Sequence, residues 1–379
     1  MVAIAQNLAR TGVFGNPFVM TLNTGPTAVV PPLYPACIAL LIKILGNSGA
    51  WIVLAGGVIL VHGLHASLLP RLSSLIYADP RPGIYGAIVS VLLPVYSWMP
   101  YWDAMYAATG LMLFCVASAR WLRSQWPLAP IASGLSAGVL ALMNPLSALV
   151  SVTWILFLLR DNGGSVKSRL HFCAMFAAVL AIAILPWSLR NYRQFGTFSL
   201  KTNFGMTVYA SNNDCASSAM INNLESGCYA THHPYGSVAE AKLLKSLGEA
   251  GYDRHRTAAT IKWVRDHRDR FIKLTTARVV EFWFPNPAYG WYGCSIWLIT
   301  ALSIPGVLFM IRRGVRAIYF VAVVFLTYPC AYYLVVSDYR YRYPILWLSL
   351  LVAGYCVETI RTGAARASRR KDDFPERPA

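Results

Sequence analysis

Charged residues are scarce in this chain, and acidic ones are the scarcest. Asp, Glu, Lys and Arg make up 13% of the 379 residues, whereas soluble domains average about 25%. Hydrophobic residues make up 56%, which is more than a soluble core can bury. They gather in runs bounded by charge, such as Ala50 to Leu69 and Met175 to Leu185, which is the pattern of membrane spans separated by loops. We therefore expect an integral membrane protein and exclude a soluble enzyme.

Motifs of soluble enzymes are missing as well. The sequence contains no Gly-rich phosphate loop, dinucleotide fingerprint or serine nucleophile elbow, so soluble nucleotide substrates are not indicated. His232-His233 lacks carboxylate or cysteine partners at metal-ligand spacing. His62 and His65 lie within an apolar run, where packing against other helices is favoured over a cavity lining. We expect no metal and no cofactor.

The net charge of +17, from 33 basic and 16 acidic side chains, has a local explanation. Basic residues gather at the ends of the apolar runs, as in Arg120 and Arg123, Arg312 to Arg316, and Arg361 to Lys371. That distribution favours orientation by the positive-inside rule. We expect no nucleic-acid partner.

The hydropathy pattern predicts an all-α polytopic membrane protein with about nine transmembrane helices. The predicted spans are residues 50–71, 83–98, 104–121, 129–144, 147–160, 170–188, 291–311, 317–337 and 343–361. Several are shorter than the roughly 20 residues that cross a bilayer. The pair that meets at Asn144-Pro145 is therefore alternatively a shallow hairpin.

One further apolar stretch, Val29 to Leu45, precedes these spans. Pro31, Pro32 and Pro35 lie at its start, and Lys43 interrupts its second half. We interpret it as an amphipathic helix in the outer membrane interface, whose start the prolines fix and whose lysine reaches the headgroups.

Basic connections alternate along the chain and predict its orientation. Residues 72–82, 120–128, 160–169 and 312–316, and the tail after 361, are expected in the cytoplasm. The predicted organisation is an outer loop with the interfacial helix (1–48), a first transmembrane bundle (49–189), an extracytoplasmic loop domain (190–290), C-terminal transmembrane helices (291–361) and a disordered cytoplasmic tail (362–379).

The loop domain should be mostly helical. Apolar residues recur at helical spacing in 239–248 and 256–280, and Ser237 with Glu240 fits a capping box. Cys215 and Cys228 fall in the same loop and are expected to form a disulfide if it faces an oxidising compartment. Most of the other cysteines lie in apolar runs and should be inert.

Asp103 is the sharpest single candidate residue. It lies at the outer mouth of a predicted span, where a carboxylate is costly unless it faces a polar cavity or a cation. The alternative is a helix N-cap, a position where Asp is favoured and where its charge suits the helix dipole.

Two arginine groups lie at the same outer level. Arg340 and Arg342 flank Tyr341, and two guanidiniums beside tyrosines can bind a lipid phosphate; an aromatic belt with snorkelling arginines is the alternative. Arg190 and Arg193 end the span before the loop and either bind an anionic headgroup or anchor the helix.

A series of short motifs runs along nearly the whole chain. They are Ile4 to Gly12, Gly25 to Ala28, Pro31 to Pro35, Asp103 to Met105, Asn144-Pro145, Pro186 to Arg193, Asn212-Asn213, Trp283 to Pro285 and Arg340 to Pro344. Their order, together with the topology, resembles the membrane glycosyltransferases of the C superfamily. That family includes protein O-mannosyltransferases, lipid A aminoarabinose transferases and many bacterial relatives.

The resemblance implies an inverting transfer of a sugar from a polyprenyl-phosphate donor to a cell-envelope acceptor, which is a glycan, a lipid or a protein. It also implies a multi-pass protein of the bacterial inner (plasma) membrane with its large loop outside the cytoplasm. Asp103 matches the family's second outer-loop carboxylate and would be catalytic. Arg340 and Arg342 match the cations near the donor phosphate, whose departing charge they would stabilise; Tyr341, Arg190 and Arg193 are further candidates for that site.

One departure from the family pattern concerns the N-terminus. In the family a first helix and then an acidic residue, often the catalytic base, precede the segment that begins here at Met1, and residues 1–48 contain no Asp or Glu. We expect an N-terminally truncated chain or a member without activity. The alternative classes are a transporter or flippase, which would usually show internal repeats, and an inactive membrane subunit.

Overall fold

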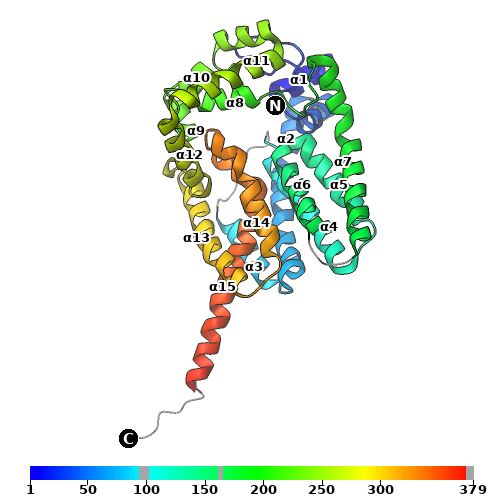
Figure 1. Ribbon diagram of the computed structural model, residues 1–379, viewed down its shortest axis with the longest axis vertical. Coiled ribbons are helices and arrows are strands. Elements are labelled where there is room, and N and C mark those ends of the chain that lie inside the picture. The colour runs from blue at the N-terminus through cyan, green and yellow to red at the C-terminus, as the bar shows by residue number, and fades with distance from the viewer. Residues whose placement is uncertain (94–101, 161–164, 373–379) are drawn as a thin grey trace.

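A computed structural model of the protein describes residues 1–93, 102–160 and 165–372, and within these ranges the chain is helical and contains no β-strand (Figure 1). In chain order the elements are α1 (Val2–Thr11), α2 (Leu33–Tyr77), α3 (Arg81–Leu92), α4 (Ala104–Ser124), α5 (Ala129–Met143), α6 (Pro145–Arg160), α7 (Val166–Phe195), α8 (Phe204–Ser211), α9 (Met220–Glu225), α10 (Cys228–His232), α11 (Val238–Asp266), α12 (Arg268–Trp283), η1 (Pro287–Tyr289), α13 (Trp291–Arg312), α14 (Ile318–Thr327), η2 (Pro329–Leu334), η3 (Tyr339–Arg342) and α15 (Tyr343–Asp372). The all-α prediction is confirmed for these residues.

Five helices among the described residues are long and apolar enough to cross a membrane: α2, α4, α7, α13 and the stretch Tyr339–Gly363 that contains most of α15. They indicate a membrane protein. Three more predicted spans correspond to the shorter apolar helices α5, α6 and α14 with η2. The span predicted for 83–98 begins in α3, and its part from 94 onward lies outside the described residues. The count of nine therefore stays a prediction.

The central element of the bundle is α15. In its most apolar window 89% of residues are buried, against 17% for α7, and α15 packs against α3, α4 and α13. On α7, by contrast, large apolar side chains such as Ile182 and Leu185 are exposed. Apolar side chains on an outer face need lipid around them, so α7 is suited to the lipid boundary and α15 to the protein interior.

Close helix approach around α15 depends on glycine. A Cβ atom at Gly354 would overlap the carbonyl of Pro82 in α3, and one at Gly306 in α13 would overlap the carbonyl of Val352. Small residues of this kind let transmembrane helices pack backbone against backbone.

We expect Gly354→Leu to lower the unfolding temperature of the purified protein, because α3 would have to move away from α15; overpacking of this kind costs about 1–3 kcal/mol. Gly363 lies further along the same helix with no atom within 4 Å of a Cβ, so Gly363→Leu is the matched control. Thermal unfolding followed by circular dichroism measures both. Equal unfolding temperatures for the two variants would contradict the packing described here.

The helix labelled α2 contains a break at Gly46, whose φ of 70° and ψ of 176° are not helical. Residues 33–45 therefore form a helix distinct from the one that follows, which is the division predicted from the sequence. Tyr34 and Ile38 on this first part are buried, whereas Leu40 and Ile44 are exposed. Its location in a membrane interface remains a prediction.

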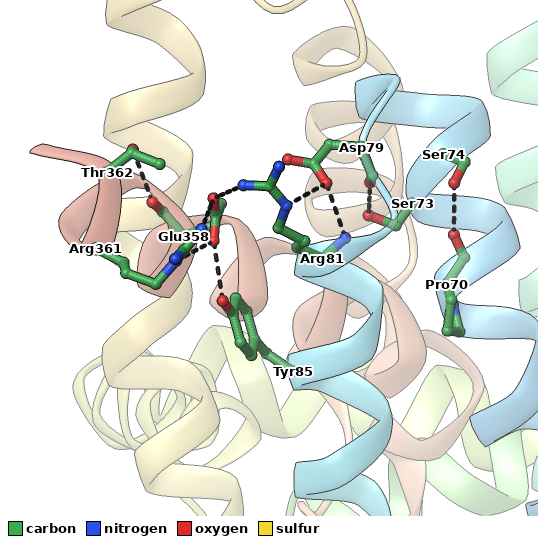
Figure 2. Close-up of polar contacts among 9 residues, drawn as sticks. All are labelled: Pro70, Ser73, Ser74, Asp79, Arg81, Tyr85, Glu358, Arg361 and Thr362. Carbon is green, nitrogen blue, oxygen red and sulfur yellow. Dashed lines mark hydrogen bonds and ion pairs between the residues drawn. The ribbon is translucent and has the colours of Figure 1, made fainter. Parts of the chain in front are cut away.

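The beginning of α3 is joined to the later part of α15 by the polar network in Figure 2. Glu358 accepts hydrogen bonds from Arg81 Nη1 at 2.8 Å, from the Tyr85 hydroxyl at 3.0 Å and from Arg361 Nε at 2.9 Å. The basic segments 72–82 and the region after 361 thus lie at one end of the bundle. A single orientation in the membrane requires that proximity.

The opposite end of the bundle carries residues 197–283, which contain α8 to α12 and are called the cap below (Figure 1). Helices cover both segments of the cap that were predicted to be helical, but their limits differ from the prediction. The segment 256–280 is divided at His267 between α11 and α12, and α11 is broken at Gly248, whose φ is 68°. Ser237 accepts a hydrogen bond from Glu240 N at 3.3 Å and so caps α11. The Glu240 carboxylate does not complete a capping box but binds Tyr252 and Arg256 instead.

Within the cap, Cys215 and Cys228 form a disulfide, the pairing expected from the sequence. The structure corrects one sequence-based statement here, because His232 does have cysteine neighbours: its Nδ1 lies 3.7 Å from Cys215 Sγ. Both sulfurs are joined to each other, so we assign no metal ion to this group.

Two helices continue past the predicted domain boundaries. The first bundle was expected to end at residue 189, but α7 continues to Phe195, where Gly196 with a φ of 67° ends it. The tail from 362 was expected to be disordered, but α15 continues to Asp372. Ala and Arg dominate the first part of that tail, and both are strong helix formers, which outweighs the density of charge. Residues 373–379 lie outside the described part.

Candidate active site

Asp103 lies directly before α4, at the position of a helix N-cap, yet its side chain makes no capping hydrogen bond. Its exposure is 9%. Burial raises the pKa of the Asp103 carboxyl to about 6, against the opposing effects of a hydrogen bond with its own backbone and of the nearby cations Arg340 and Lys201. Helix capping therefore does not explain why an acidic residue occupies position 103. A buried carboxylate with a raised pKa beside cations is a common feature of catalytic sites.

Arg340 is held close to Asp103 by its neighbours. Its Nε atom lies 3.2 Å from Asp338 Oδ2, and its guanidinium lies 3.5 Å from the centre of the Trp102 ring. Trp102 precedes Asp103 in the chain, so the stacking links η3 to the start of α4. An ion pair on one edge and an aromatic ring on the face fix the direction of a guanidinium, which is a more rigid arrangement than a solvated arginine.

Lys201 is a site residue that the sequence analysis missed. It follows α7, and its ammonium group interacts electrostatically with both Asp103 and Asp253. Burial lowers the pKa of Lys201, and the two carboxylates oppose that change. A single lysine in an irregular segment gives no periodic signal. Only the folded chain brings it within electrostatic range of Asp103.

Tyrosines line the same region. Tyr341 stacks on Tyr332 with ring centres 4.4 Å apart, and the Tyr332 and Tyr328 hydroxyls lie 3.2 Å apart. Both Tyr328 and Tyr332 interact electrostatically with Asp103, and Tyr229 of the cap interacts with Arg340. Residues of η2 and η3 thus lie around the Asp103 carboxylate, and α10 adds Tyr229 beside Arg340. The flat, partly polar tyrosine rings are suited to contact a sugar or a lipid headgroup.

Arg342, which the sequence grouped with Arg340, has a different role. It is 1% exposed, and its guanidinium donates to the Trp283 carbonyl, the Thr300 hydroxyl and, at 3.2 Å, the Ser349 hydroxyl. These buried hydrogen bonds favour a structural role for Arg342, and its assignment to a donor phosphate stays a prediction. The reason is local: η3 is a 3-10 helix with three residues per turn, so residues two apart point in different directions.

Arg190 and Arg193 are not among the residues described around Asp103 and Arg340. Arg190 donates to the Thr27 carbonyl at 2.8 Å and to the Phe14 carbonyl at 3.3 Å, and it stacks on Trp187. It thus fixes the N-terminal segment to α7, which is the anchoring alternative. Arg193 is exposed near the end of α7, and the contacts described for Asp103 and Arg340 do not include it.

No family model, curated protein or solved structure matches this chain. The likeness to membrane glycosyltransferases thus rests on the order of the sequence motifs.

Proposed function

We propose that this protein is a membrane glycosyltransferase that moves a sugar, with inversion, from a polyprenyl-phosphate donor to a glycan, lipid or protein of the cell envelope. The observation that carries the proposal is the buried carboxylate of Asp103, which interacts electrostatically with the cations of Arg340 and Lys201. These three side chains come from three distant parts of the chain. Their convergence where the bundle meets the cap is what a site for an anionic, membrane-anchored substrate requires.

In the proposed reaction an acceptor hydroxyl attacks the anomeric carbon of the donor sugar. The bond from that carbon to the phosphate oxygen breaks, and the new bond to the acceptor forms on the opposite face. Asp103 takes the hydroxyl proton as general base. Arg340 and Lys201 stabilise the charge on the departing polyprenyl phosphate, and they do so without reorganising because both are already held in place. Tyr341 contacts the donor beside Arg340.

The membrane arrangement belongs to the same proposal. The long apolar helices support a multi-pass membrane protein. We place it in a bacterial inner membrane with the cap outside the cytoplasm and the Glu358 network on the cytoplasmic side. A disulfide in the cap supports that side for residues 190–290, since disulfides persist in oxidising compartments.

The test is an assay of the purified protein in lipid vesicles with a panel of synthetic polyprenyl-phosphate hexoses and pentoses. A membrane extract of the expression host supplies the acceptors. We expect release of free polyprenyl phosphate, measured by mass spectrometry, together with sugar-labelled acceptor. Binding of a donor without release would point to an inactive subunit. Movement of a donor across the vesicle membrane with its sugar bond intact would point to a transporter.

A further inference from the structure

The backbone that carries Lys201 is fixed by the last turns of α7. The Ser199 carbonyl accepts a hydrogen bond from Asn191 Nδ2 at 2.8 Å, and the Leu200 carbonyl accepts one from Trp187 Nε1 at 2.9 Å. Both donors are side chains of α7, and Asn191 is fully buried. The two residues before Lys201 are thus held from one side.

The residue after Lys201 is held from the other side. Thr202 N donates to the Ala28 carbonyl at 2.9 Å, and its hydroxyl donates to Glu249 Oε2 at 2.6 Å. Glu249 also accepts from Ala28 N at 2.8 Å and from the Thr27 hydroxyl. This carboxylate is 5% exposed, and it comes directly after the break at Gly248 in α11. One buried acid therefore joins the N-terminal segment, the chain around Lys201 and the cap.

A buried carboxylate with several hydrogen bonds is a strong and specific anchor, because a donor removed from it leaves part of its charge unsatisfied. A lysine side chain alone has a long and flexible stem. Asp253 lies one turn after Glu249 on α11, accepts a hydrogen bond from Gly205 N at 2.6 Å, and interacts with Lys201. The ammonium group thus interacts electrostatically with one carboxylate of the cap and with Asp103.

We propose that Glu249 and Thr202 are positioning residues that hold Lys201 beside Asp103, so that Lys201 controls the protonation state of Asp103. Their effect on catalysis rests on the proposed transfer reaction, whereas the electrostatic coupling does not. Through this contact the cap acts on a carboxylate at the start of α4. The cap has to be seated correctly before Asp103 is readily ionised.

Other groups around Asp103 also act on its titration. They are Arg340 before α15, the amino group of Met1, Tyr34 of α2, and Tyr328 and Tyr332 around η2. A variant at Lys201 or Thr202 leaves all of these side chains in place. The difference between such a variant and the wild type therefore reports the lysine alone.

The experiment is an infrared titration of the purified full chain, which follows the protonated-carboxyl band that is lost in Asp103→Asn. Lys201→Gln is expected to raise the midpoint of this band by about one pH unit, because a neighbouring cation favours the carboxylate. Thr202→Val, which removes the hydroxyl at nearly constant shape, should raise the midpoint in the same direction. Thr202→Ser keeps the hydroxyl and should titrate like the wild type.

Thr27→Val is the matched control. It removes the same kind of hydrogen bond from the same carboxylate, but at Oε1, whereas Thr202 binds Oε2. It should leave the midpoint unchanged. If Thr202→Val does not fold, Glu249→Gln takes its place with the same expected shift. A Lys201→Gln midpoint equal to that of the wild type would overturn the coupling, and a shift in Lys201→Gln without one in either positioning variant would overturn the role of Thr202 and Glu249.

The two proposals fail separately. If the variants shift the midpoint but the protein releases no polyprenyl phosphate, the positioning role is supported and the transferase function is contradicted. If the protein releases polyprenyl phosphate but the variants do not shift the midpoint, the transferase function is supported and the positioning role is contradicted. With both intact, Thr202→Val should lower turnover most at acidic pH, and raising the pH should restore it. A variant that was only less stable would not recover in this way.

Discussion

Asp103→Asn is expected to abolish sugar transfer while the protein stays folded. A positioned general base contributes about 10²- to 10⁴-fold to rate, and Asn cannot take the proton. The change is nearly isosteric, and the Asp103 side chain makes no capping hydrogen bond that the variant would lose. Release of polyprenyl phosphate, measured alongside thermal unfolding, checks both parts. Asp266→Asn, at an exposed position in the cap, is the control and should keep full activity.

The pH dependence follows from the same residue. Burial raises the pKa of Asp103 to about 6 from its ordinary value of 3.8, so the base is protonated and inactive below that pH. Activity should fall as the pH decreases through about 6 and level off above it. The free energy of unfolding changes in the opposite direction. Above pH 3.8 the carboxyl ionises in the unfolded chain, whereas burial opposes its ionisation in the folded protein, so Asp103 lowers the stability as the pH rises toward about 6. Asp103→Asn should therefore unfold at the same or a higher temperature at neutral pH, and a lower one would argue for a structural role.

The fold was predictable where hydrophobic length determines structure. A helix that faces lipid needs about 20 apolar residues, and the runs that became α4, α7 and α13 have that length. The pattern was less informative for α5, α6 and α14, which are too short to identify as spans from length alone. The charge density of the C-terminal segment predicted disorder, whereas its helix propensity continues α15 to Asp372.

The site was predictable only in part, for a similar reason. A lone carboxylate at the start of a span is costly, so Asp103 could be identified from its position alone. Arg340 and Arg342 could not be distinguished, because their different surroundings arise from the 3-10 geometry of η3. Lys201 could not be found at all. Its placement depends on hydrogen bonds to residues far away in the chain, including Ala28 and Glu249.

The two neighbouring arginines should give opposite results when each is changed to Gln. Arg340→Gln removes a cation from beside Asp103 and from the proposed phosphate site. We expect transfer to fall by about 10²-fold or more with little change in unfolding temperature. Arg340→Lys keeps the charge but loses the planar group that stacks on Trp102 and pairs with Asp338. It should recover only part of the activity.

Arg342→Gln should do the reverse, because the Trp283 carbonyl and the Thr300 and Ser349 hydroxyls lose a buried donor. Each buried group left without a partner costs about 1–3 kcal/mol, so we expect a clearly lower unfolding temperature but near-normal turnover per folded molecule. Circular dichroism and the release assay on the same preparations measure the two quantities. Loss of turnover in Arg342→Gln at an unchanged unfolding temperature would indicate that Arg342 binds the donor phosphate. In that case the site would have to extend into the bundle between α13 and α15, and not toward the cap.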